Sequence, residues 1–160
     1  MEIENKEEEI EEKGKESLSR RLRNATPEEL PDLLREYHSE MITSPHPFAD
    51  YMRNKCKEKG ILQQNVFLAA DLSENYGYKL IAEEKRTRQR DVILRLCLAA
   101  HFSEWETGKA LILYGMAPLY PCFPRDAVLV AAINNGVYDL QEINRLLERF
   151  SQTPLVKDYE

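Results

Sequence analysis

The chain has 160 residues, of which 42% are hydrophobic and 31% are charged, and its formal net charge is −6. This length suits one domain with a short appendage and is enough to bury a core without disulfides or metals. No window approaches about 18 consecutive apolar residues, which excludes a membrane span. The opening Met1-Glu2-Ile3-Glu4 lacks the basic and apolar stretches of a signal peptide, so we expect a cytoplasmic protein.

The acidity is concentrated at the N-terminus. Residues 1–16 contain eight Glu against three Lys, a net charge of −5, whereas residues 17–160 contain 19 Lys and Arg against 20 Asp and Glu. A charge block of this kind is typical of a solvated, disordered segment. We therefore expect an acidic disordered tail over residues 1–18. The remainder is nearly neutral, so the overall charge does not exclude DNA as a partner.

Residues 19–44 are expected to form a short N-terminal helix and a linker. Thr26-Pro27-Glu28-Glu29 combines a hydroxyl cap, a proline at the first helical position and a glutamate at the third, which predicts a helix that fades near Met41. Pro31 lies early in this helix, so we expect the helix either to start later or to be distorted. Ser44-Pro45-His46-Pro47 disfavours helix, so we place the boundary before the main domain at about residue 44.

Beyond this boundary the apolar residues follow helical spacing, with no sustained alternation of period two, which predicts an all-α fold without a sheet. Helices are expected at about residues 48–59, 63–70, 73–83, 89–100, 104–114, 124–135 and 139–150. The expected caps are Ser73, Ser103 and Asp139 at helix starts, and Gly60, Gly115 and Gly136 at helix ends.

Two of these helices have an apolar face that we expect to be buried. The face of helix 89–100 consists of Val92, Ile93, Leu96 and Cys97. The face of the last helix consists of Ile143, Leu146, Leu147 and Phe150.

The sequence contains no pattern that indicates catalysis or a metal site. Cys56, Cys97 and Cys122 are widely spaced and form no CxxC pair, which favours reduced, buried thiols. No HExxH, GxSxG, P-loop or glycine-rich dinucleotide motif occurs. We therefore expect no enzyme activity, no cofactor and no metal.

The pair of helices at 63–70 and 73–83, joined by a tight turn, has the dimensions of a DNA-binding helix-turn-helix. In that motif the second helix enters a major groove about 12 Å wide. Asn pairs with adenine, Lys reaches guanine or phosphate, and a basic loop strengthens phosphate binding. The side chains expected at the DNA are Ser73, Glu74, Asn75, Tyr78 and Lys79, followed by Lys85, Arg86, Arg88 and Arg90 in a basic loop.

Some residues of this region have a structural interpretation as well. Tyr76 and Tyr78 lie two positions apart and cannot face the same way on a helix, so we expect Tyr76 to be the more buried of the two. Gly77 permits the close approach of another helix or of DNA, or is simply tolerated near a helix start. Arg90-Asp91 and Arg125-Asp126 are expected to be structural ion pairs rather than functional ones.

Several stretches resemble a bacterial branch of the Xre/Cro-type, lambda-repressor-like helix-turn-helix family. They are Gly60-Ile61, residues 73–80 (SENYGYKL), residues 85–94 (KRTRQRDVIL), residues 116–121 (MAPLYP), residues 124–127 (PRDA) and residues 144–147 (NRLL). The resemblance covers about residues 45–155. It implies a bundle of about five helices over residues 45–118, a C-terminal extension of two helices over residues 119–160, and a DNA-binding transcriptional regulator.

The sequence departs from this family at Glu83, where we expect a glycine to close the second helix of the motif with a positive φ. Two functions therefore stay open. Asn75, Lys79 and the basic loop favour DNA. The acidic tail, Glu74 and the Glu83-Glu84 pair favour a protein interaction module that keeps the fold without binding DNA, through a partner protein or self-association.

Overall fold

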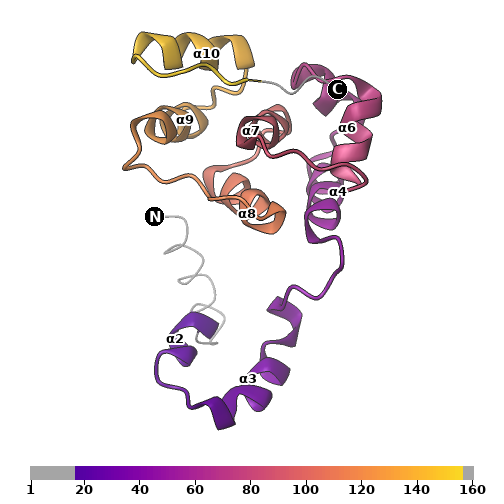
Figure 1. Cartoon of the computed structure of the whole chain (residues 1–160), viewed down its shortest axis with the longest axis vertical. Coiled ribbons are helices and arrows are strands. Elements are labelled where there is room, and N and C mark those ends of the chain that lie inside the picture. Colours follow the sequence, from indigo (N-terminus) through magenta and orange to yellow (C-terminus); the bar gives the residue numbers. More distant parts are fainter. Residues whose placement is uncertain (1–16, 157–160) are drawn as a thin grey trace. The chain divides into compact units, whose positions relative to one another are not determined.

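The computed structural model describes residues 17–156, and within this range it contains helices and turns but no strand. The chain divides into two compact units, Met1–Thr43 and Ser44–Glu160 (Figure 1). The division lies at the proline-containing segment that begins at Ser44. Nearly all of the expected acidic tail lies outside the described residues. No described helix is both long enough and apolar enough to cross a membrane.

The first unit contains more helical pieces than the single helix expected after Thr26. Its elements are α2 (Leu18–Leu22), a 3-10 turn (Pro27–Glu29), α3 (Leu30–Glu36) and a second 3-10 turn (His38–Glu40). Thr26 donates its amide to the Glu29 carboxylate at 3.1 Å, as expected for a helix start. The α-helix starts only at Leu30, with Pro31 in its first turn, which is one of the two outcomes expected from this proline. It ends at Glu36, and a separate 3-10 turn, not the same helix, continues to Glu40.

The second unit contains its helices close to the expected positions. They are α4 (Pro47–Lys59), α5 (Gln63–Ala69), α6 (Glu74–Ile81), α7 (Arg90–Ala99), α8 (Glu104–Tyr114), α9 (Pro124–Asn134) and α10 (Leu140–Arg149). The side chains of Ser73, Ser103 and Asp139 each accept the backbone amide three residues later, at 3.0–3.3 Å. The local capping signals therefore placed these helix starts correctly.

Helix ends in the second unit turn through the left-handed region. Gly60, Gly115 and Gly136 do so as expected, but Asp71, Glu83, His101 and Ser151 also have φ values of 55–59°. The amide after such a residue bonds to a carbonyl five positions back, for example Leu72 to Phe67 at 3.0 Å. This bond satisfies a carbonyl that the helix leaves unpaired, which offsets part of the cost of about 1–2 kcal/mol for a non-glycine residue there.

Helix α7 forms the centre of the second unit (Figure 1). Every residue from Val92 to Ala99 is buried, so the buried surface is much wider than the four-residue stripe expected from the sequence. Helix α7 packs against α5, α8 and α10, α4 packs against α8 and α6, and α9 packs against α8 and α10. A helix that is buried on all sides is typical of the core of a multi-helix domain.

Two expectations about burial are wrong. Phe150 is 55% exposed, because α10 ends at Arg149 and the buried face is completed by Leu140 from its first turn. Cys122 is exposed in the connector between α8 and α9, whereas Cys56 and Cys97 are buried as expected.

Two ion pairs join the first turns of α7 and α9, each between an arginine of one helix and an aspartate of the other. Arg90 donates to both carboxylate oxygens of Asp126 at 2.9 Å, and Arg125 donates to both carboxylate oxygens of Asp91 at 2.7 and 2.8 Å. Asp126 is 5% exposed and also accepts the Tyr120 amide at 2.9 Å. Bidentate pairs with additional hydrogen bonds hold α9 in register on α7.

Candidate nucleic-acid interface

The crossing of α5 and α6 is set by a close contact at Gly77. A Cβ atom at this position would lie 2.3 Å from Cδ1 of Phe67, a ring that is only 1% exposed. Any side chain larger than hydrogen would therefore push the two helices apart. Gly77 serves the approach of α5, which is one of the two roles that the sequence left open.

The outer face of α6 carries exposed polar side chains. Glu74, Asn75 and Lys79 are exposed, and Tyr78 is 43% exposed with its ring edge-on to Phe67 at 4.8 Å. Tyr76 is 4% exposed and faces inward, as expected from its spacing to Tyr78. Ser73 is exposed, and its hydroxyl caps the helix by accepting the Tyr76 amide at 3.3 Å.

The loop after α6 is held against the core by its middle residue. Thr87 is buried and donates its amide to the hydroxyl of Tyr114 at 2.8 Å. Arg86 and Arg88 on either side of Thr87 are exposed, as is Lys85, whose ammonium lies 5.0 Å from the centroid of the Tyr76 ring. The three cations are therefore displayed by a loop with a defined backbone.

Arg86 also supports the loop, although its side chain is 56% exposed. It donates to the carbonyl of Tyr114 at 2.6 Å, and its guanidinium carbon lies 4.2 Å from the centroid of the Tyr114 ring. It also pairs with Glu83 at 3.1 Å. A phosphate contact by Arg86 would have to compete with all three interactions.

Arg90 is engaged in the same way at the start of α7. In addition to Asp126, it donates to the carbonyls of Ala117 and Pro118 at 3.0 Å. Arg90 has a structural ion pair, as expected, but its partner is Asp126 and not the neighbouring Asp91, and its guanidinium holds the α8–α9 connector.

Glu83 differs from the expectation in two ways. It adopts a φ of 58°, which we expected only a glycine to adopt readily. Its side chain is 6% exposed and accepts the amide of Ala49 at 3.3 Å, in the first turn of α4. The negative charge is thus placed at a helix N-terminus and beside Arg86, where it is stabilised, and it does not project from the outer face of α6. Glu84 remains exposed.

An apolar region lies beside these polar groups. Leu62, directly before α5, is 62% exposed, and Leu68, on α5, is 80% exposed. A shallow pocket lies between α5 and the start of α6 and is lined by Gln64, Asn65, Phe67, Leu68, Leu72 and Glu74. Exposed apolar residues of this kind mark sites of protein contact more often than sites of phosphate contact.

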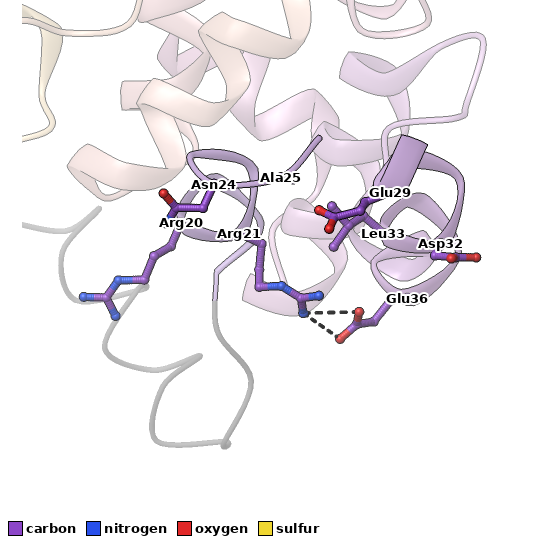
Figure 2. A pocket seen from close by; sticks show the side chains of 8 residues that line it. All are labelled: Arg20, Arg21, Asn24, Ala25, Glu29, Asp32, Leu33 and Glu36. Carbon is purple, nitrogen blue, oxygen red and sulfur yellow. Dashed lines mark hydrogen bonds and ion pairs between the residues drawn. The ribbon is translucent and has the colours of Figure 1, made fainter. Parts of the chain in front are cut away.

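A separate pocket of about 500 Å³ lies in the first unit, between α2 and α3 (Figure 2). Arg21 donates to both carboxylate oxygens of Glu36 at 3.1 and 3.2 Å, whereas Arg20 points away from this pair. The eight lining residues include no histidine or cysteine, and the described part of the chain contains no cluster of side chains suited to a metal ion. We therefore place the candidate site on α6 and its loop.

Comparison of the chain with models of protein families, with curated proteins and with solved structures found no match. The function is therefore inferred from the geometry of α5, α6 and the loop that follows. The spacing of the sequence predicts an inward Phe67 and a close approach at Gly77, but it does not show that these two residues meet. The contact of Thr87 with Tyr114 beneath the loop has no signal in the sequence.

Proposed function

We propose that the chain is a DNA-binding transcriptional regulator of the helix-turn-helix type, with a lambda-repressor-like fold in residues 45–118. The observation that carries this proposal is the pairing of α5 and α6. The contact of Gly77 with Phe67 holds α6 at a set angle, while Asn75 and Lys79 stay on its outer face. A helix that enters a groove needs both a fixed support and an outward polar face.

In this proposal α6 lies in the major groove and the following loop lies along the phosphates. Asn75 has the amide geometry to pair with adenine, and Lys79 reaches guanine or a phosphate. Lys85, Arg86 and Arg88 are all exposed, but Arg86 is engaged by Tyr114 and Glu83, so we assign the phosphate contacts to Lys85 and Arg88. Arg86 and Arg90 hold the loop and the connector, and we assign them a supporting role.

The test is a DNA-binding titration, first with genomic fragments selected by the protein and then with single sites at two salt concentrations. Asn75→Ala should cost about 1–3 kcal/mol and relax the preference at one base position. Arg88→Ala should weaken binding to all sequences alike and reduce the salt slope by about 0.9, because one fewer phosphate is neutralised.

The matched control is Arg145→Ala. Arg145 is also an exposed arginine, but it lies on α10, which Figure 1 shows on the other side of α7 from α6. Its loss should leave both affinity and salt slope unchanged. Equal effects of Arg88→Ala and Arg145→Ala would remove the assignment of the loop. The absence of salt-dependent binding by the wild type at about 50 mM salt would remove the DNA proposal itself.

A second function is supported by the exposed leucines. Leu68, at 80% exposure, and Tyr78 would form the centre of a surface that docks a partner protein by apolar contact. In that case Leu68→Asp should abolish complex formation, whereas Arg88→Ala should have little effect. The same two variants have the opposite ranking if the chain binds DNA, so one set of proteins distinguishes the two functions.

A further inference from the structure

The residues that follow α10 form a strap, residues 151–156, which is held mainly through its backbone. Arg125 donates to the carbonyls of Thr153 and Pro154 at 2.9 and 3.0 Å. Asp91 accepts the amide of Val156 at 3.0 Å, and Asn144 accepts the amide of Leu155 at 2.9 Å. Hydrogen bonds to the main chain, combined with a buried site for one side chain, are the way in which proteins hold extended peptides.

Leu155 is the side chain of the strap that is buried in the core. This side chain is 3% exposed and belongs to the core cluster, whereas the neighbouring Val156 is 47% exposed. Burial of a leucine stabilises by about 1.5–3 kcal/mol. Leu155 is therefore the residue whose loss should release the strap, and Val156 provides a matched position on the same strap.

Arg95 connects this strap to the pair of helices proposed to bind DNA. It is 7% exposed, and it donates to the carbonyls of Leu155 at 2.5 Å and Val156 at 2.8 Å. It also donates to the carbonyl of Ala70 at 3.3 Å, the residue that closes α5. One buried guanidinium thus joins the strap to the beginning of the α5–α6 turn.

We propose that Arg95 is a positioning residue for α6. Arg95 transmits the presence of the bound strap to the α5–α6 turn. A buried cation needs its acceptors, because an unpaired buried charge is strongly destabilising. When the strap leaves, Arg95 loses two of its carbonyl acceptors, and we expect its guanidinium to shift away from Ala70. The carbonyl of Ala70 then loses its donor, directly before Asp71, whose φ is 55°. The turn loosens and α6 loses its set angle.

Amide hydrogen exchange tests this coupling without DNA, so it is independent of the proposed function. The reporter is the amide of Leu72, bonded to Phe67 at 3.0 Å in the turn. The internal control is the amide of Met116, which makes the same type of bond to Leu111 at 2.8 Å at the end of α8. Leu155→Ala should accelerate exchange of Leu72 at least about tenfold relative to Met116. Val156→Ala and the volume-conserving Leu155→Met should leave the ratio unchanged.

A milder variant keeps the proposal testable if Leu155→Ala loosens the whole unit. Asn144→Ala removes only the hydrogen bond to the Leu155 amide and should raise the same ratio by a smaller factor. A ratio that stays constant in both Leu155→Ala and Asn144→Ala overturns the coupling, whatever the protein binds.

The effect on DNA rests on the proposed function and forms a second arm of the experiment. Leu155→Ala should lower DNA affinity about tenfold or more with the salt slope unchanged, because no phosphate contact is removed. Unchanged DNA affinity together with a raised exchange ratio would show that the turn responds to the strap but does not position a DNA-reading helix. That outcome overturns the role of Arg95 in positioning α6 for DNA. A wild type that binds no DNA removes the proposed function alone, since the exchange result still decides the coupling.

Discussion

The contact between Gly77 and Phe67 makes Gly77→Ala the most informative single substitution in this protein. A Cβ atom at position 77 would lie 2.3 Å from Cδ1 and 2.4 Å from Cγ of Phe67. Carbon atoms that are not bonded pack at about 3.5–4.0 Å, so the ring or the helix has to retreat by about 1 Å or more. Phe67 is 1% exposed and its ring also contacts Tyr78, so a retreat would disturb packing that is already in place.

The expected loss of stability follows from two opposing terms. Overpacking of a rigid core position costs about 1–3 kcal/mol, and a 2.3 Å contact belongs at the upper end of that range. Alanine gains about 1 kcal/mol over glycine from its helix propensity. We therefore expect Gly77→Ala to lower the free energy of unfolding by about 2 kcal/mol, measured by urea denaturation.

Gly108 provides the matched control, because it is also a helical glycine in the second unit. A Cβ atom there would lie 3.7 Å from Cβ of Pro118, an ordinary contact distance. Gly108→Ala should therefore stabilise the protein by about 0.4–1 kcal/mol. If Gly77→Ala proves as stable as Gly108→Ala, the close approach of α5 and α6 does not exist in solution.

A double-mutant cycle identifies the partner. In a Phe67→Ala background the space beside position 77 is open, and Gly77→Ala should then cost nothing or stabilise slightly. A coupling energy near zero between the two substitutions would show that the cost of Gly77→Ala arises elsewhere.

Three further predictions concern the core, the tail and the response to acid. Leu96→Ala on the buried helix α7 should cost about 2–5 kcal/mol in urea denaturation, and a loss below about 1 kcal/mol would contradict its burial. Deletion of residues 1–16, which carry eight Glu, should raise affinity for random DNA at low salt if the tail competes for the basic loop, and an unchanged affinity would exclude that role. Burial opposes ionisation of Asp91, but hydrogen bonds from Arg125 and from the Val156 amide outweigh it and lower the pKa of this carboxyl. Its stabilising effect is therefore complete above about pH 4 and is lost as the pH falls through the folded-state pKa. Asp91→Asn should remove this contribution to the loss of stability at acid pH. If the wild type and Asp91→Asn lose stability identically as the pH falls, the assignment is refuted.

The helix positions of the second unit were predictable because their signals are local. A hydroxyl at Ser73 or Ser103 needs only the amide three residues later, and a glycine at position 60 or 115 needs only its own backbone. The same locality explains the failures. The glycine signal is absent at Asp71, where the sequence indicates a tight turn but does not show that the residue will adopt a φ of 55°.

The candidate site was predictable as a set of residue types, but the assignment of roles was not. Four basic residues of the loop look alike in sequence. Two of them, Arg86 and Arg90, donate hydrogen bonds to backbone carbonyls 27 or more residues away. These carbonyls belong to Tyr114, Ala117 and Pro118. Hydrogen bonds over such separations leave no periodicity and no spacing rule, so only the folded chain shows that Arg86 and Arg90 have a supporting role.

The position of Glu83 removes one sequence-based objection to DNA binding. A glutamate at the end of the second helix of the motif suggests repulsion of phosphate, yet this carboxylate accepts the Ala49 amide and pairs with Arg86 at 3.1 Å. Its partner Arg86 in turn holds the Tyr114 carbonyl. The pair therefore connects the start of α4, the loop and the end of α8 at nearly no net charge. The remaining exposed charges near a DNA backbone are positive at Lys79, Lys85 and Arg88 and negative at Glu74 and Glu84. Their sum is a small positive charge. A small balance predicts modest, steeply salt-dependent affinity, in which the fixed angle of α6 decides more than the total charge.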